Sequence, residues 1–195
     1  MTCWAIIPVK APDTAKLRLA TVLSPGERAR LVAAMLDHVV ATCGNARHVG
    51  HTCLVGPSRH GQPTALALLD DPGIGLNAAL TSALDQAEAG GARRVIVIPG
   101  DLPRVTVQDM ELLAVVPATA IGIAPDRHGT GTNALSLPLP AARGFRFAFG
   151  DDSFALHQAE AARLGLAVEA IHSPTLAKDI DVPADLADAD DLLGE

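Results

Sequence analysis

Two of the three lysines in the chain fall in one short segment near its N-terminus. Lys10 and Lys16 lie there with Arg18 beside them, directly after the apolar residues 3–9, and the third lysine is Lys178. A nucleoside triphosphate carries several negative charges, and lysine binds such groups as a mobile point charge. The spacing is also typical of a solvated basic loop, and it lacks the GxxxxGK[ST] pattern of a P-loop. We expect Lys10, Lys16 and Arg18 to bind the phosphates of a nucleotide.

Three aspartates lie where an extended segment ends or a helix begins. Asp101 follows the apolar residues 94–99, and Asp179 and Asp181 alternate along a stretch before a predicted helix. Alternate residues of an extended segment point the same way, so both carboxylates can face one metal ion, and Mg²⁺ prefers oxygen ligands. Asp101 could instead be a turn residue, and Asp181 could be a helix cap. We expect all three aspartates to share a Mg²⁺ site.

Glycines also precede a predicted helix, at Gly73 and Gly75. Glycine lets a ligand approach the backbone N–H groups at the N-terminus of a helix, so Gly75 and Asn77 would lie near the nucleoside. A single GxG is equally typical of an ordinary turn followed by a helix, and the pattern alone leaves both interpretations open.

Two further segments are rich in hydrogen-bond donors for an anion. Residues 129–133, which end in Thr132 and Asn133, combine two glycines, two threonines and an asparagine, and Gly150 and Ser153 lie at the start of a predicted helix. Backbone N–H groups and hydroxyls at such positions can hold a carboxylate or a phosphate. The two aspartates between Gly150 and Ser153 would repel a phosphate unless they turn away, and they could be helix caps. We expect the two segments to form two walls of one anion pocket.

The elements that must position these residues alternate along the chain. Apolar runs predict strands over residues 3–9, 51–55, 65–69, 94–99, 119–124, 133–137 and 167–172. Helical spacing and capping signals predict helices over residues 24–42, 77–89, 106–115, 153–164 and 183–193. This order predicts an α/β fold with a mostly parallel central sheet flanked by helices, in which ligands gather at the carboxyl ends of the strands.

Composition limits the class of protein. The chain has 195 residues, 49% of them hydrophobic, which fits a single domain over residues 1–195. A formal net charge of −7 argues against a nucleic-acid partner, and no apolar run reaches the roughly 20 residues of a membrane helix. We find no signal peptide and expect a cytoplasmic protein whose three cysteines are reduced thiols.

The order of these motifs resembles one family along nearly the whole chain, roughly residues 6–186. The matching strings are IPVKAPDTAKLRLATVLSPGER, GLNAAL, GDLP, APDRHGTGTNAL, FGDDSFALHQAEA and DIDVPADL. They resemble the CofC/FbiD family, the guanylyltransferases of deazaflavin coenzyme F-420 biosynthesis. This family belongs to the MobA-like nucleotidyltransferases, which have a single Rossmann-like α/β domain. The glycine-rich LxGGxSxRMG loop of MobA itself is missing, and PVK stands in its place.

The resemblance implies a reaction and its site. GTP and a phosphorylated acid would give a guanylylated diphosphate and pyrophosphate, and the acids used in the family are 2-phospho-L-lactate, phosphoenolpyruvate and 3-phospho-D-glycerate. By this resemblance Asp101, Asp179 and Asp181 match the metal ligands, and Thr132, Gly150 and Ser153 match the residues that contact the acid. We expect Mg²⁺, with two ions, and catalytic roles for Lys16 and Asp101. A downstream deazaflavin-coupling transferase and a homodimer are the partners that the family suggests.

These residue types suit that chemistry. A phosphate monoester has a second pKa of about 6, so at neutral pH it is already a nucleophile and needs no catalytic base. Cations and metal ions would bring two anions together and help pyrophosphate to leave. Two alternatives stay open at this point: a MobA-like enzyme with another nucleotide or acceptor, and a non-catalytic nucleotide-binding regulator.

Overall fold

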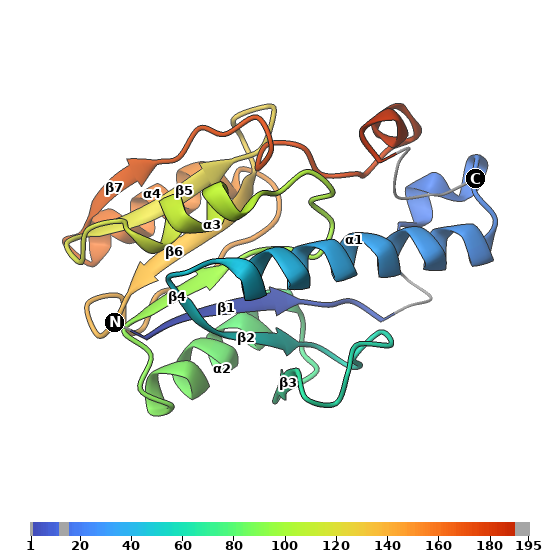
Figure 1. Ribbon diagram of the computed structural model, residues 1–195. Coiled ribbons are helices and arrows are strands. Elements are labelled where there is room, and N and C mark those ends of the chain that lie inside the picture. Colours follow the sequence, from blue (N-terminus) through green and yellow to red (C-terminus); the bar gives the residue numbers. More distant parts are fainter. Residues whose placement is uncertain (1, 12–15, 190–195) are drawn as a thin grey trace.

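The computed structural model describes residues 2–11 and 16–189, and its centre is one sheet of seven strands (Figure 1). The strands are β1 (Cys3–Pro8), β2 (Val49–Val55), β3 (Ala67–Leu69), β4 (Arg94–Val97), β5 (Ala120–Pro125), β6 (Thr132–Pro138) and β7 (Ala167–Ala170). Their order in the sheet is β3-β2-β1-β4-β6-β5-β7. β6 runs antiparallel to its neighbours β4 and β5, and the other paired strands are parallel. The prediction of a mostly parallel sheet is confirmed.

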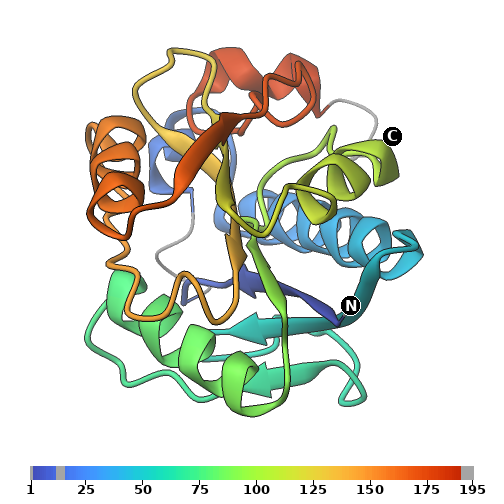
Figure 2. The same cartoon turned by 90° about the vertical axis from the view of Figure 1, so that its left-hand side faces the viewer.

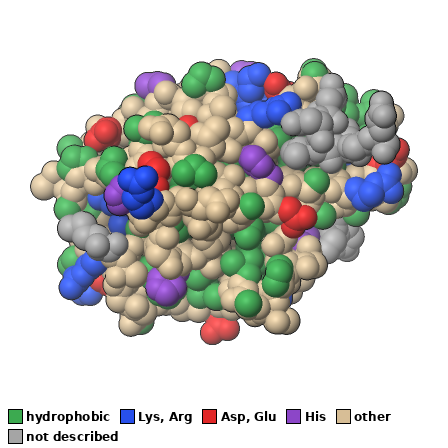
Figure 3. Space-filling model, in the orientation of Figure 1, with side chains coloured by type: hydrophobic (Ala, Val, Ile, Leu, Met, Phe, Trp, Pro, Cys, Tyr) green, Lys and Arg blue, Asp and Glu red, His purple; other side chains and the backbone are tan. Residues whose placement is uncertain are grey.

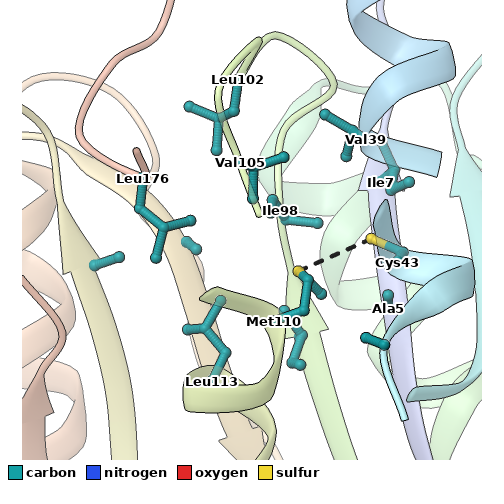
Figure 4. Packing of buried hydrophobic residues seen from close by; sticks show 14 of the residues in the cluster. Ala5, Ile7, Val39, Cys43, Ile98, Leu102, Val105, Met110, Leu113 and Leu176 are labelled. Atoms are coloured by element: carbon teal, nitrogen blue, oxygen red, sulfur yellow. Dashed lines mark hydrogen bonds between the residues drawn. The ribbon is translucent and has the colours of Figure 1, made fainter. Parts of the chain in front are cut away.

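Helices cover both faces of the sheet (Figure 2). α1 (Pro25–Asn45) and α3 (Val107–Ala114) lie on one face, and α2 (Leu76–Ala89) and α4 (Ser153–Arg163) lie on the other. Successive strand residues point to opposite faces, so Ala5 and Ile7 of β1 pack with α1 and α3, whereas Ile6 packs with α2 and α4. In Figure 4, Cys43 of α1 faces Met110 of α3 across this layer, with their sulfur atoms 4.0 Å apart.

The seven predicted strands and the first four predicted helices are found, with most ends within one to three residues of the predicted ones. The prediction of a long last helix over residues 183–193 is wrong in the part that is described. The chain there forms a short 3₁₀ helix, η3 (Pro183–Asp188), as is common in such connecting turns, and residues 190–193 lie outside the described residues. A second 3₁₀ helix, η2 (Leu17–Thr21), lies in the segment expected to be a loop.

α1 begins where its sequence predicts. The Ser24 hydroxyl accepts a hydrogen bond from the Glu27 backbone N–H at 3.3 Å, and the Glu27 carboxylate accepts one from the Ser24 backbone N–H at 2.7 Å. This capping box fixes the first turn of a helix whose buried face carries Met35 and Leu36. Both side chains also reach the cleft described below, so the helix helps to build the site.

The surface and the cysteines carry few specific features. Within the described residues no helix is both long and apolar enough to cross a membrane. On the face drawn in Figure 3, the Lys and Arg side chains are spread out rather than gathered in one patch. Cys3, Cys43 and Cys53 are free and buried, and burial raises the pKa of Cys3 and of Cys43 to about 12.

Candidate active site

A cleft with a volume of about 700 Å³ opens where β1, β2 and β4 end. These strands are parallel, so their carboxyl ends meet at one edge of the sheet, the place where α/β proteins bind ligands. Six residues predicted for nucleotide or metal binding line the cleft: Lys10, Lys16, Arg18, Gly75, Asp101 and Asp181. The fold therefore brings together segments from the beginning, the middle and the end of the sequence.

Lys16 lines this cleft and pairs with two aspartates. Its Nζ atom lies 2.5 Å from Oδ2 of Asp101 and 2.9 Å from Oδ1 of Asp181, and its side chain is only 8% exposed. Burial by itself would lower the pKa of Lys16, but the charges and hydrogen bonds of the two aspartates outweigh burial and raise it. One ammonium group thus joins carboxylates that are far apart in the sequence.

Asp179 belongs to the same charged group, and Arg127 supports it. Burial and the nearby charges of Asp101 and Asp181 raise the pKa of Asp179. Arg127 donates to the backbone carbonyl of Asp179 and, at 2.6 Å, to Oδ1 of Asp185. The Asp179 carboxylate also lies 3.7 Å from the Arg127 guanidinium, so it has a positive partner of its own.

The residue that caps η3 is Asp185 rather than Asp181. Its Oδ2 atom accepts hydrogen bonds from the backbone N–H groups of Asp181 and Val182, at 2.8 and 2.9 Å. The helix-cap interpretation of Asp181 is therefore wrong, because its carboxylate turns to Lys16 in the cleft.

The donor set of the cleft suits a hard metal ion. Among the described residues no group of three or more His, Cys, Asp or Glu side chains is arranged to hold a metal ion. Asp101 and Asp181 nevertheless converge on one cation, the Lys16 ammonium, and carboxylate oxygens are the ligands that Mg²⁺ prefers. A Mg²⁺ site shared by Asp101, Asp179 and Asp181 stays a prediction, and it would require Lys16 to shift.

The other predicted nucleotide-binding residues differ in their placement. Lys10 is exposed, and so is the Arg18 side chain, which lies 3.8 Å from Oδ2 of Asp181. Gly75 directly precedes α2 with a φ of 109°, a backbone conformation that favours glycine, and an added Cβ would meet nothing within 4 Å. The entrance of α2 is therefore open toward a ligand.

Asn77 makes hydrogen bonds inside the protein. Its side-chain amide donates to the backbone carbonyl of Phe149 at 3.3 Å and accepts from the backbone N–H of Phe149 at 2.9 Å. The amide is thus used to tie the first turn of α2 to the residue before Gly150. A contact of Asn77 with the nucleoside stays a prediction.

The two segments predicted to form the anion pocket are in contact. The backbone N–H of Phe154 in α4 donates to the carbonyl of Thr130 at 3.0 Å. Gly150 has a φ of 134° with open space around it, and Ser153 is buried at the start of α4. Asp152 occupies the N-cap position but makes no side-chain capping bond. The segments therefore lie together as expected, although the interpretation of Asp152 as a capping side chain is wrong.

Two side chains of the first segment form hydrogen bonds inside the protein. Oγ1 of Thr132 lies 3.0 Å from Nδ1 of His157, and Nδ2 of Asn133 donates to the backbone carbonyl of Leu176 at 2.8 Å. Both residues are buried. Contacts of Thr132, Asn133, Gly150 and Ser153 with an acid substrate stay predictions.

Sequence reasoning missed Arg127, Asp185 and His157. His157 lies four residues after Ser153 on α4, so helical spacing could have placed it on the same face. Arg127 and Asp185 are far apart along the chain, and no local pattern links them. They could be found only once the fold had brought residues 127 and 185 together.

Two solved structures that are named as transferases share the α/β fold of this chain. A putative nucleotide-diphospho-sugar transferase from Desulfovibrio desulfuricans shares the fold with a TM-score of 0.75 at 16% identity, covering 99% of this chain and 97% of that one. A nucleotidyl transferase from Methanothermobacter has a TM-score of 0.66 at 15% identity, covering 98% and 97%.

The chain belongs to the family described as guanylyl transferase CofC like, whose sequence model matches residues 3–190. A relative from Sphaerobacter thermophilus, named phosphoenolpyruvate guanylyltransferase, is 42% identical, and the match covers 95% of this chain and 91% of the relative's chain. A relative from Methanothermobacter thermautotrophicus, named 2-phospho-L-lactate guanylyltransferase, is 36% identical with coverages of 96% and 83%. The resemblance inferred from the motifs is confirmed.

Proposed function

We propose that this protein transfers GMP from GTP to the phosphate of a small phospho-carboxylic acid and releases pyrophosphate. The observation that carries the proposal is the cleft in which Lys16 joins Asp101 and Asp181, with Lys10 and Arg18 beside them. Phosphoenolpyruvate is the acid we favour, because relatives at 42% and 41% identity carry that name. 2-Phospho-L-lactate and 3-phospho-D-glycerate are the alternatives, and the reaction would serve deazaflavin coenzyme biosynthesis.

In the proposed reaction a phosphate oxygen of the acid attacks the α-phosphorus of GTP. The bond from that phosphorus to the oxygen bridging the α- and β-phosphates breaks, and the bonding electrons leave with pyrophosphate. The attacking oxygen is already ionised at neutral pH, so no residue has to remove a proton. Mg²⁺, with two ions expected, would be held by Asp101, Asp179 and Asp181 and would neutralise the charge on the phosphates.

The side chains of the cleft bind and orient the nucleotide. Lys10 and Arg18 are exposed at its rim, where they can reach the outer phosphates of GTP. Lys16 is buried beside Asp101 and supplies positive charge next to the reacting phosphate. Gly75 leaves the N-terminus of α2 open for close approach of the nucleotide.

The acid would bind between residues 129–133 and the start of α4. It has two anionic ends, and each needs several directed donors. Backbone N–H groups near Gly150 and the hydroxyls of Thr132 and Ser153 are the donors we assign to it, with Asn133 shaping the wall through its bond to Leu176.

A panel of substrates tests the reaction. We expect pyrophosphate release to require GTP and a phospho-acid, with phosphoenolpyruvate the fastest of the three acids. GTP, CTP and ATP are each combined with every acid and with a sugar phosphate, and the deazaflavin-coupling enzyme is added to consume the product. Turnover only with CTP or with the sugar phosphate would indicate a MobA-like enzyme that uses another nucleotide or acceptor. Nucleotide binding without any turnover would indicate a regulator.

The substitution Thr132→Val tests the acid pocket, because it keeps the shape of the side chain and removes the hydroxyl. We expect the KM for the acid to rise about 10- to 150-fold, the effect of losing one hydrogen bond to a charged group, while the KM for GTP stays near that of wild type. Thr119→Val, at an exposed position, is the matched control. Unchanged KM and kcat in both Thr132→Val and Ser153→Ala would show that the acid binds elsewhere.

A further inference from the structure

A buried histidine lies behind the proposed acid pocket and has no part in the reaction described above. His157 of α4 is fully buried, with its ring centroid 5.6 Å from that of Phe145 and 4.9 Å from that of Phe149. Both ring nitrogens have polar partners. Nε2 lies 3.0 Å from the backbone nitrogen of Ala148, and Nδ1 lies 3.0 Å from Oγ1 of Thr132. Packing and hydrogen bonds together hold the ring in one orientation.

The two hydrogen bonds decide which ring nitrogen carries the proton. The backbone N–H of Ala148 can only donate, so Nε2 of His157 must accept and carries no hydrogen. A neutral imidazole has one N–H group, which must then be at Nδ1. Burial lowers the pKa of His157 to about 4, which keeps the ring neutral at physiological pH. Nδ1–H therefore donates, and the hydroxyl oxygen of Thr132 accepts.

This direction of donation sets the role of the Thr132 hydroxyl. A hydroxyl has one proton to donate and two lone pairs that accept. Since Oγ1 accepts from His157, its own hydrogen remains for another acceptor. Within the described residues no other side-chain hydrogen bond of Thr132 is found. With the opposite tautomer, Nδ1 of His157 would be the acceptor, and the Thr132 hydroxyl would donate its only hydrogen to the ring.

We infer that His157 is a positioning residue for the substrate: its Nδ1–H group holds Oγ1 of Thr132 as an acceptor and so directs the threonine hydroxyl as a donor to an anionic group of the phospho-acid. Carboxylate and phosphate oxygens are acceptors only, so a threonine in this state matches them. The inference rests on the proposed function, which places the acid at Thr132.

The tautomer is tested on the free wild-type protein, with no acid present. In ¹⁵N-histidine NMR spectra, we expect His157 to show a protonated Nδ1 and an unprotonated Nε2, unchanged from about pH 5 to pH 8. Loss of the signal in His157→Gln assigns it among the seven histidines. A proton on Nε2, or a doubly protonated ring at pH 6, would overturn the inference whatever the protein's substrate is.

Two matched variants test the effect on the substrate. The side-chain nitrogen of His157→Asn takes the position of Nδ1 and can still donate to Thr132. His157→Gln instead reaches toward Ala148 and removes that donor. We expect His157→Gln to raise the KM for the acid about tenfold and His157→Asn to raise it much less, with the KM for GTP unchanged in both. In a Thr132→Val background, His157→Gln should add nothing further.

The outcomes separate this inference from the proposed function. Equal effects of His157→Asn and His157→Gln, or a further loss from His157→Gln in the Thr132→Val background, would mean that the ring acts only through packing, and would overturn the inference. A protonated Nδ1 together with an unchanged acid KM in Thr132→Val would instead overturn the proposed acid pocket while the assigned tautomer stood.

Discussion

The substitution Asp101→Asn is expected to lower kcat about 10²- to 10³-fold and to leave the protein folded. The asparagine keeps the size of the side chain and can still accept a hydrogen bond from Lys16, but it lacks the charge needed to hold a cation beside the reacting phosphates. Losses of this size follow removal of one preorganised electrostatic group from an active site. Stability should change little, because removing Asp101 also relieves the repulsion that raises the pKa of Asp179.

Two measurements check this expectation. Steady-state pyrophosphate release gives kcat, and urea unfolding gives the free energy of unfolding. Asp85→Asn is the control, since it makes the same chemical change at an exposed position on α2. If Asp101→Asn turns over at the wild-type rate, Asp101 is only a turn residue.

The second large effect is expected from Lys16→Met. This change removes the only charge that touches both Asp101 and Asp181 in the described cleft, and we expect kcat/KM for GTP to fall about 10²-fold. Lys178→Met is the control, because Lys178 is a more exposed lysine paired with Asp188 at 2.7 Å. Wild-type kinetics in Lys16→Met would show that Lys16 has no part in nucleotide use.

Lys16→Met should also change how stability depends on pH. Burial would raise the pKa of Asp181, but Lys16 outweighs it and keeps the pKa below its ordinary value. Such a depressed pKa contributes stability at neutral pH, and that contribution is lost as the pH falls through the folded pKa. The variant should therefore be less stable than wild type at pH 7, and the difference should narrow as the pH falls below about 4, because the folded pKa of Asp181 lies under its ordinary value. Urea unfolding at pH 7 and below about pH 4 measures the difference.

The strands and helices could be predicted because hydrophobic periodicity and capping residues are local signals. The capping box of Ser24 and Glu27 and the alternation of Ala5, Ile6 and Ile7 needed no knowledge of the rest of the chain. The direction of β6 could not be predicted, because an apolar run reads the same in both directions. The short η3 helix was missed since a capping signal does not say how long the helix will be.

The candidate site was predicted in part for similar reasons. Lys16 and Asp101 each follow a predicted strand, and this position in the sequence predicted that both would lie at the same edge of the sheet. Their direct ion pair could not be predicted, since lysine would bind a phosphate or a carboxylate equally well. The partners of Asn77 and Asn133 could not be predicted either, because an amide side chain binds a ligand or the protein's own backbone with the same groups. In the structure both side chains bind backbone groups.

The Lys16 ammonium also determines the ionisation of the site before any substrate arrives. Burial and the charges of Asp101 and Asp181 raise the pKa of Asp179, even though Arg127 lies 3.7 Å from its carboxylate. The pKa of Asp181 is lowered instead, because Nζ of Lys16 lies 2.9 Å from its carboxylate. A cation that replaces Lys16 at Asp181 therefore meets a carboxylate that is already ionised. Its binding there exchanges one positive partner of Asp181 for another, and no proton has to leave that carboxylate first.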